Sequence, residues 1–148
     1  VFYIGGTKNG ALIGEAIIIN NQELNEDFRF HIKQRGGMLA KGRLIGIQFA
    51  ELFKNDLFFE MGKHANAMAK KLAEGISSQG YSFLTEPSSN QIFPIFPNQL
   101  IVQLQSQFDF FVWEKIDANK SAIRLVTSWA TPEDKVEAFI TSLTLKEE

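Results

Sequence analysis

Residues 1–20, VFYIGGTKNGALIGEAIIIN, decide how the chain is interpreted. Two apolar segments flank a glycine-rich break, and Lys8 lies at the centre of that break. Apolar runs of this length are typical of buried strands, so we expect strands over residues 1–4 and 11–19. A lysine between two such strands is either an exposed loop residue, as most lysines are, or an amine positioned for covalent chemistry with carbonyl compounds.

Composition limits the classes of protein that the chain can represent. Its 148 residues, 45% hydrophobic and 22% charged, are typical of one globular domain with a core. A net charge of −2 gives no basic excess for nucleic acid. The absence of cysteine excludes disulfides and thiolate metal sites and suits a reducing compartment, so we expect a cytoplasmic protein. No apolar stretch approaches the roughly 18 residues of a membrane helix, so we expect no membrane partner.

The middle of the chain has helical periodicity. Apolar residues recur at helical spacing and predict helices over residues 22–34, 38–53 and 56–76. Gly36 lies in the first break, and Gly80 is expected just after the last helix, where glycine accepts a left-handed backbone.

The last part of the chain predicts a β-β-α-β-β-α order, with helices packed on one face of a small antiparallel or mixed sheet. Asp117–Lys120 is a hairpin turn candidate, and Thr131 is the expected N-cap of the final helix. Pro97 is expected in the first turn of the helix predicted over residues 98–106. Strands are predicted over 81–84, 91–96, 108–115 and 122–129, and helices over 98–106 and 131–143.

Four segments together resemble one family. GGTKNG followed by GEAIII, KQRGGMLAKG (33–42), HANAMAKKLAEGI (64–76) and IRLVTSWATPED (123–134) occur in the family's order. The sequence resembles the low-specificity L-threonine aldolases of the β-eliminating lyase group, which are fold-type I pyridoxal phosphate enzymes. The resemblance implies an α/β chain that forms the C-terminal part of an aspartate aminotransferase-like fold. We therefore expect Val1 to be internal to a longer protein whose N-terminal half supplies the rest of the site.

The same resemblance implies three regions. Residues 1–37 would end the large cofactor-binding domain, and residues 38–80 would form connecting long helices. Residues 81–148 would form a small C-terminal α+β domain. The resemblance also implies assembly into a homodimer or homotetramer.

The resemblance assigns roles at the lysine break. Lys8 would be the covalent attachment point of pyridoxal 5'-phosphate, with Gly6 allowing close backbone approach and the hydroxyl of Thr7 reaching the cofactor phosphate. Alternatively, the Thr7 hydroxyl bonds only its local backbone. Lys33 and Arg35 would serve a phosphate, including one bound by a neighbouring subunit; the alternative is a solvated helix end that favours cations.

Arg124 is the second candidate site residue. In the resemblance it binds the carboxylate of the amino acid substrate, because a planar guanidinium pairs with a carboxylate through two parallel hydrogen bonds. The alternative is an arginine on an edge strand that extends to solvent. His31 and His64 are expected to have surface or packing roles, and no cluster of ligands indicates a metal.

The implied activity is that of a lyase of amino acid metabolism. It would cleave a β-hydroxy-α-amino acid, threonine or allo-threonine, to glycine and an aldehyde. The alternatives are β-elimination or other amino acid chemistry on the same fold, and a stable domain without catalysis. We expect this 148-residue chain to be inactive alone.

Overall fold

A computed structural model describes residues 1–143, which form two compact units. Unit 1 comprises Val1–Glu60 and unit 2 begins at Met61, and each is described by itself. The boundary falls inside residues 38–80, the segment predicted to connect two domains. The predicted boundaries at residues 37 and 80 stay predictions. No helix among residues 1–143 is long and apolar enough to cross a bilayer.

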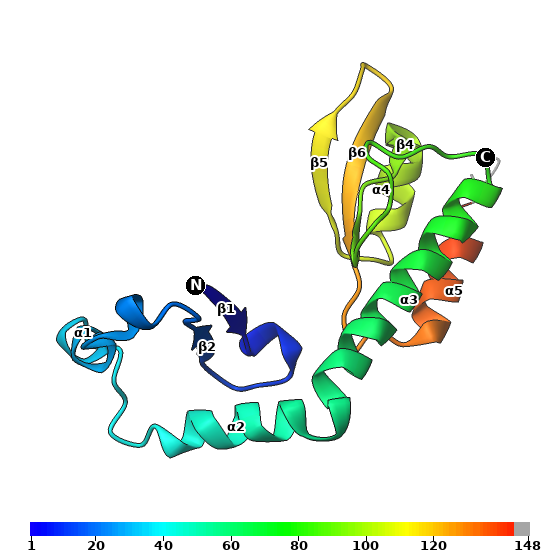
Figure 1. The fold of residues 1–148 in the computed structure, drawn as a ribbon. Coiled ribbons are helices and arrows are strands. Elements are labelled where there is room, and N and C mark those ends of the chain that lie inside the picture. Colours follow the sequence, from blue (N-terminus) through cyan, green and yellow to red (C-terminus); the bar gives the residue numbers. More distant parts are fainter. Residues whose placement is uncertain (144–148) are drawn as a thin grey trace. The chain divides into compact units, whose positions relative to one another are not determined.

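Unit 1 begins with a β-hairpin (Figure 1). Strands β1 (Phe2–Gly5) and β2 (Glu15–Ile18) pair antiparallel, from Phe2 opposite Ile18 to Gly5 opposite Glu15. The predicted strands are therefore present, the second one shorter than expected. Their predicted burial is wrong, because Tyr3 and Ile17 are 71% and 51% exposed.

The helices of unit 1 are shorter than their periodicity predicted. They comprise η2 (Gln22–Asn25), α1 (Phe28–Gln34), α2 (Arg43–Phe53) and η3 (Lys54–Asp56), followed by α3 (Leu57–Ser78), which continues into unit 2. The helix predicted over 22–34 is interrupted because Asp27 has a left-handed backbone, with φ of 52°. The helix predicted over 56–76 is confirmed as α3. Gly80 follows it with φ of 84°, as expected of glycine beyond a helix end.

The sheet of unit 2 is built around its last strand. Its strands are β3 (Gln91–Ile92), β4 (Ile95–Pro97), β5 (Phe111–Lys115) and β6 (Lys120–Val126). β6 is central and pairs antiparallel with the other three. The strand predicted over 81–84 is reduced to one bridge between Phe83 and Pro94, and the strand predicted over 91–96 is split in two.

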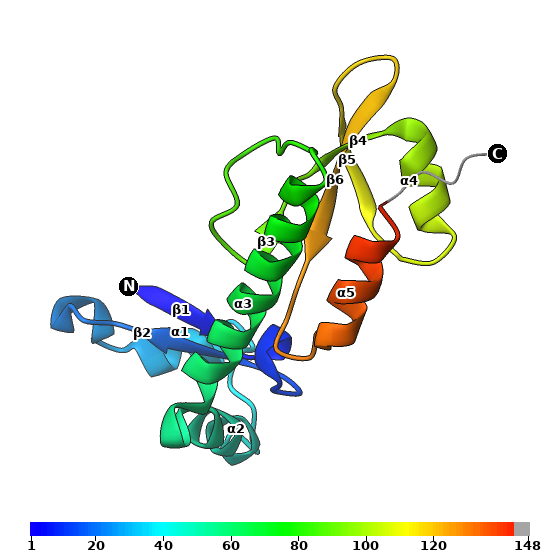
Figure 2. The same ribbon diagram turned by 90° about the vertical axis from the view of Figure 1, so that its right-hand side faces the viewer.

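Helices α3, α4 (Asn98–Gln105) and α5 (Glu133–Thr141) pack against this sheet. Both views show α3 and α5 side by side (Figures 1 and 2). The core joins residues from all three helices and the strands: Met68, Ala69, Leu72, Ala73, Ile76, Ile92, Phe96, Leu100, Ile101, Leu104, Ile123, Leu125, Val136, Phe139 and Leu143. The predicted packing of helices on a small antiparallel sheet is confirmed.

Turn and cap predictions for unit 2 have mixed outcomes. The hairpin turn is present, because Asp117 Oδ1 accepts hydrogen bonds from the backbone N–H of Asn119 at 2.7 Å and Lys120 at 2.9 Å. Thr131 is not the N-cap of α5, since its hydroxyl accepts from the Ser128 N–H at 2.8 Å. Pro97 lies at the N-cap of α4 and not in its first turn, and Pro132 lies at the N-cap of α5.

Candidate functional site: a lysine turn and an arginine on aromatic rings

Lys8 lies in a short turn whose backbone is fixed by hydrogen bonds. The turn is the 3-10 helix η1 (Thr7–Asn9), between β1 and β2. Gly6 donates to the Gly14 carbonyl at 3.0 Å. The Gly6 carbonyl in turn accepts from the N–H groups of Asn9 and Ala11 at 2.9 and 3.0 Å. The turn is therefore closed by its own backbone, and the exposed Lys8 side chain takes no part in holding it together.

Steric constraints explain why glycine occupies positions 6 and 10 of this turn. A Cβ at Gly6 would lie 2.9 Å from the Ala11 Cβ and 3.0 Å from both the Gly14 carbonyl oxygen and the Phe49 ring. Gly10, which ends the turn, has φ of 89°, a conformation that L side chains rarely adopt. The GGTKNG pattern thus encodes the backbone that presents the lysine.

This geometry fits an aldehyde cofactor. A primary amine forms a covalent bond with an aldehyde only if the amine can be reached, and the Lys8 side chain is exposed on a backbone that does not depend on it. Thr7, also exposed, places a hydroxyl next to it in sequence. The residues that are present are therefore compatible with pyridoxal 5'-phosphate, and the role of Lys8 as its covalent anchor stays a prediction.

Lys33 and Arg35 lie at the C-terminal end of α1. Both are exposed, and the Arg35 N–H donates to the His31 carbonyl at 3.1 Å. Figure 1 shows α1 at the end of unit 1 away from the turn that carries Lys8. Within this chain the structure does not bring these cations to Lys8, and their assignment to a phosphate stays a prediction.

Arg124 lies on the central strand of the unit 2 sheet. Its neighbours Ile123 and Leu125 point into the core, with exposed fractions of 0% and 8%, so the Arg124 side chain emerges on the other face. The alternative interpretation, an edge-strand arginine, is wrong because β6 is paired on both sides.

Two aromatic rings contact the Arg124 guanidinium. Its Cζ lies 5.2 Å from the ring centroid of Phe111 and 5.4 Å from that of Trp113, within the range of cation–π attraction. Arg124 Nε is buried and has no hydrogen-bond partner in the described structure. The side chain also lines a cavity of 320 Å³, together with Asp109 and Lys135 among other residues.

Sequence reasoning missed these aromatic residues. Phe111 lies directly opposite Arg124 in the register of β5 and β6. Trp113 follows two positions later and packs on Phe93, with ring centroids 5.2 Å apart. The F-x-W pattern in a strand paired with an arginine-bearing strand is a signal that could have found them, because alternate residues share a face.

The histidines do not form a reactive cluster. His64 Nε2 lies 2.8 Å from the backbone carbonyl oxygen of Thr131, a contact that connects α3 to the segment before α5. His31 is exposed on α1. Among residues 1–143 no group of three histidine or carboxylate side chains could hold a metal ion.

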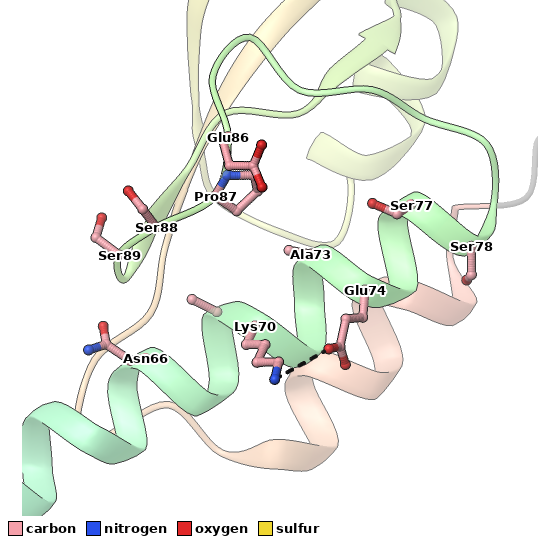
Figure 3. Close-up of a pocket in the computed structure, with 11 residues that line it drawn as sticks. Asn66, Lys70, Ala73, Glu74, Ser77, Ser78, Glu86, Pro87, Ser88 and Ser89 are labelled. Atoms are coloured by element: carbon pink, nitrogen blue, oxygen red, sulfur yellow. Dashed lines mark ion pairs between the residues drawn. The ribbon is translucent and has the colours of Figure 1, made fainter.

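A larger hollow of 780 Å³ lies between α3 and residues 86–89 (Figure 3). Lys70 and Glu74 face it as an ion pair of 3.8 Å, and both side chains are more than two-thirds exposed. None of the site residues predicted from the sequence lines this hollow. Its size therefore does not connect it to the predicted chemistry.

An ion-pair cluster joins α3 to α5. Lys71 Nζ lies 2.6 Å from Glu133 Oε1 and 2.5 Å from Glu137 Oε1. The hydrogen bond from Lys71 lowers the pKa of Glu133, and its bonds to both carboxylates raise the pKa of Lys71. This cluster fastens the two helices to each other.

Lys8 belongs to unit 1 and Arg124 to unit 2.

Three relatives share the sequence or the fold. No family model matches the chain. A low-specificity L-threonine aldolase of Pseudomonas aeruginosa is 30% identical over 98% of this chain and 41% of its own length. Another from a Pseudomonas species is 28% identical over 92% of this chain and 39% of its own length. The solved threonine aldolase of Leishmania major superposes with a TM-score of 0.91 and 45% identity over 96% of this chain and 42% of that one.

The chain spans about two-fifths of the length of these relatives. A TM-score of 0.91 at 45% identity confirms the predicted fold class, the C-terminal part of a fold-type I α/β enzyme. The chain is a relative of the low-specificity L-threonine aldolases and corresponds to a part of their length.

Proposed function

We propose that the whole protein is a pyridoxal phosphate-dependent lyase that cleaves threonine or allo-threonine to glycine and an aldehyde. The observation that carries the proposal is the match to the Leishmania major threonine aldolase, at 45% identity over 96% of this chain. The exposed amine on a closed, glycine-dependent turn supports it independently of the match.

In this proposal the Lys8 amine would hold the cofactor aldehyde in the absence of substrate. Bound pyridoxal phosphate withdraws electrons from the substrate α-carbon. Thr7 offers its hydroxyl to the cofactor phosphate, and Gly6 keeps the turn at its observed geometry. The amine of Lys8 is then free to move a proton in the substrate complex.

Arg124 binds the substrate carboxylate in this proposal and so orients the Cα–Cβ bond. Its buried Nε has no hydrogen-bond partner within residues 1–143, which supports an acceptor that comes from a ligand. Lys33 and Arg35 serve a phosphate of a neighbouring subunit in a homodimer or homotetramer. We also propose the cytoplasm as the compartment of the whole protein.

The test uses the complete protein that contains this chain. Purified protein should show the long-wavelength absorbance of bound cofactor and release acetaldehyde and glycine from threonine. Lys8→Ala should lose that absorbance and lower the rate by at least about a thousandfold, since covalent attachment and proton transfer both fail. Lys41→Ala, which removes another exposed lysine of unit 1, is the matched control and should retain both signals.

Two results would contradict the proposal. Release of ammonia and a keto acid without acetaldehyde would indicate β-elimination on the same fold. Full activity of Lys8→Ala would remove the lysine from the chemistry. The 148-residue chain alone should not cleave threonine, and turnover by that chain would show that no further residues are needed.

A further inference from the structure

The surroundings of Arg124 contain more than the sequence indicated. Within residues 1–143 the structure gives its guanidinium no carboxylate partner, and Nε is buried without a hydrogen bond. A buried donor without an acceptor is costly, so the conformation must be held by other contacts. The contacts present are with aromatic rings: Phe111 at 5.2 Å and Trp113 at 5.4 Å from Cζ.

The backbone that carries these rings is fixed by the pairing of β5 with β6. Phe111 is the cross-strand partner of Arg124, so the two side chains share one face of the sheet. The register shifts between Val112 and Glu114, and Trp113 lies at this irregularity. Trp113 packs against Phe93, which lies between β3 and β4 on the opposite side of the central strand. The aromatic support therefore spans the sheet from β5 to the β3–β4 connection.

We propose that Phe111 and Trp113 are positioning residues that hold the Arg124 guanidinium unpaired and oriented for the substrate carboxylate. An arginine side chain that samples many rotamers loses conformational entropy when it binds a ligand. A guanidinium that is already stacked on aromatic rings has lost that entropy before binding. Aromatic rings fix the guanidinium plane without offering a carboxylate that would compete with the ligand. This inference rests on the proposed role of Arg124.

The test separates the two halves of the substrate. With the complete holoprotein, 3-hydroxybutanoate keeps the carboxylate of threonine and lacks the amine, and 1-amino-2-propanol keeps the amine and lacks the carboxylate. Each is measured as a competitive inhibitor of threonine cleavage and as a ligand by calorimetry. Trp113→Ala and Phe111→Leu should each weaken the binding of 3-hydroxybutanoate by about three- to thirtyfold, the range expected for the loss of one cation–π contact. Neither variant should change the affinity for 1-amino-2-propanol by more than about twofold.

Conservative variants distinguish stacking from mere bulk. Trp113→Phe and Phe111→Tyr keep an aromatic face and should restore carboxylate affinity to within about threefold of wild type. In an Arg124→Lys background, Trp113→Ala should have a much smaller effect, because a point charge does not stack as a planar guanidinium does. Val112→Ala, between the two rings on the same strand, is the matched control for loosening of β5.

The substitutions at Phe111 and Trp113 should not unfold unit 2. Phe111 and Trp113 are 68% and 53% exposed, so their truncation leaves the buried core of unit 2 intact, and circular dichroism checks this. Unchanged carboxylate affinity in both Trp113→Ala and Phe111→Leu, in protein that cleaves threonine, overturns this inference alone. An equal loss of affinity for 3-hydroxybutanoate and for 1-amino-2-propanol also overturns it. Absence of threonine cleavage in the wild-type protein would instead overturn the proposed function.

Discussion

The two units of the chain bury their apolar residues to very different degrees. In unit 2, side chains from three helices and the sheet form one core, and Ile76, Phe96 and Leu104 have exposed fractions of 0%. In unit 1, Gly6, Ala11 and Leu52 are the buried residues, whereas large apolar side chains such as Leu12 and Phe30 are 89% and 72% exposed. One unit has a core of its own, and the other presents apolar surface.

The difference bears on how each candidate site is built. The Lys8 turn is held mainly by local backbone hydrogen bonds, with Phe49 of α2 packed against Gly6, so it needs little core. Arg124 is held by a strand that is paired on both sides and backed by the core. A reactive group can thus be placed either by local chain geometry or by packing, and this chain contains one example of each.

The sharpest test of this comparison is to separate the units. Residues 57–148, which keep α3 whole, should fold alone and unfold cooperatively, because they contain the core cluster. Residues 1–56 should remain unfolded or aggregate, since they bury too few apolar residues to offset chain entropy. Amide chemical-shift dispersion and thermal melts measure both. Cooperative unfolding of residues 1–56 would show that unit 1 has stability of its own.

A pair of isoleucines sharpens the contrast at the level of one side chain. Ile76→Ala in α3 should lower the free energy of unfolding by about 2–5 kcal/mol, because a fully buried side chain leaves a cavity. Ile47→Ala in α2, where the side chain is 54% exposed, should change it by less than about 0.5 kcal/mol. Denaturant melts of the 148-residue chain compare the two. Similar effects at both positions would contradict the difference in packing.

A pair of helical glycines tests close packing in the same way. A Cβ at Gly75 would meet the Ile140 side chain at 2.5 Å, so Gly75→Ala should force α3 and α5 apart and cost about 1–3 kcal/mol. No atom lies within 4 Å of a Cβ built at Gly46 in α2, so Gly46→Ala should stabilise that helix by about 0.5–1 kcal/mol. Helix content by circular dichroism and the melting curve report both effects. Stabilisation by Gly75→Ala would show that Ile140 moves aside at no cost.

The smallest effect is expected from the ion pairs between α3 and α5. Contact with Lys71 lowers the pKa of Glu133 from 4.5, so this contribution is present above pH 4.5 and is lost as the pH falls through the lowered value. The pKa of Lys71 is raised from 10.5, so its contribution is present below pH 10.5 and is lost as the pH rises through the raised value. Lys71→Met should therefore be slightly less stable than wild type between these limits.

The pH dependence of the difference identifies its cause. Thermal melts of wild type and Lys71→Met should converge toward both pH extremes and in high salt, because the groups are solvent-exposed and screened. A difference that is constant with pH would point to lost packing of the lysine side chain instead. Lys70→Met, which removes an exposed i,i+4 pair of 3.8 Å on α3, is the matched control.

Much of the fold could be predicted from the sequence, and the misses have identifiable causes. Periodicity located α3 and the strands that became β5 and β6, because long or strongly apolar segments dominate their local alternatives. The helix predicted over 22–34 failed at Asp27, whose left-handed backbone no pattern indicated. Thr131 failed as a cap because a nearby backbone N–H took its hydroxyl.

By itself the sequence indicated the glycine-bearing turn around Lys8 and the helical and strand segments, because these depend mainly on backbone hydrogen bonds between residues close in the chain. It also carried the resemblance that pointed to Lys8 and Arg124. Only the tertiary structure decided that Arg124 lies on a central strand, against Phe111 and Trp113. Strand order and register bring together residues more than ten positions apart, and no local preference of the chain specifies that pairing.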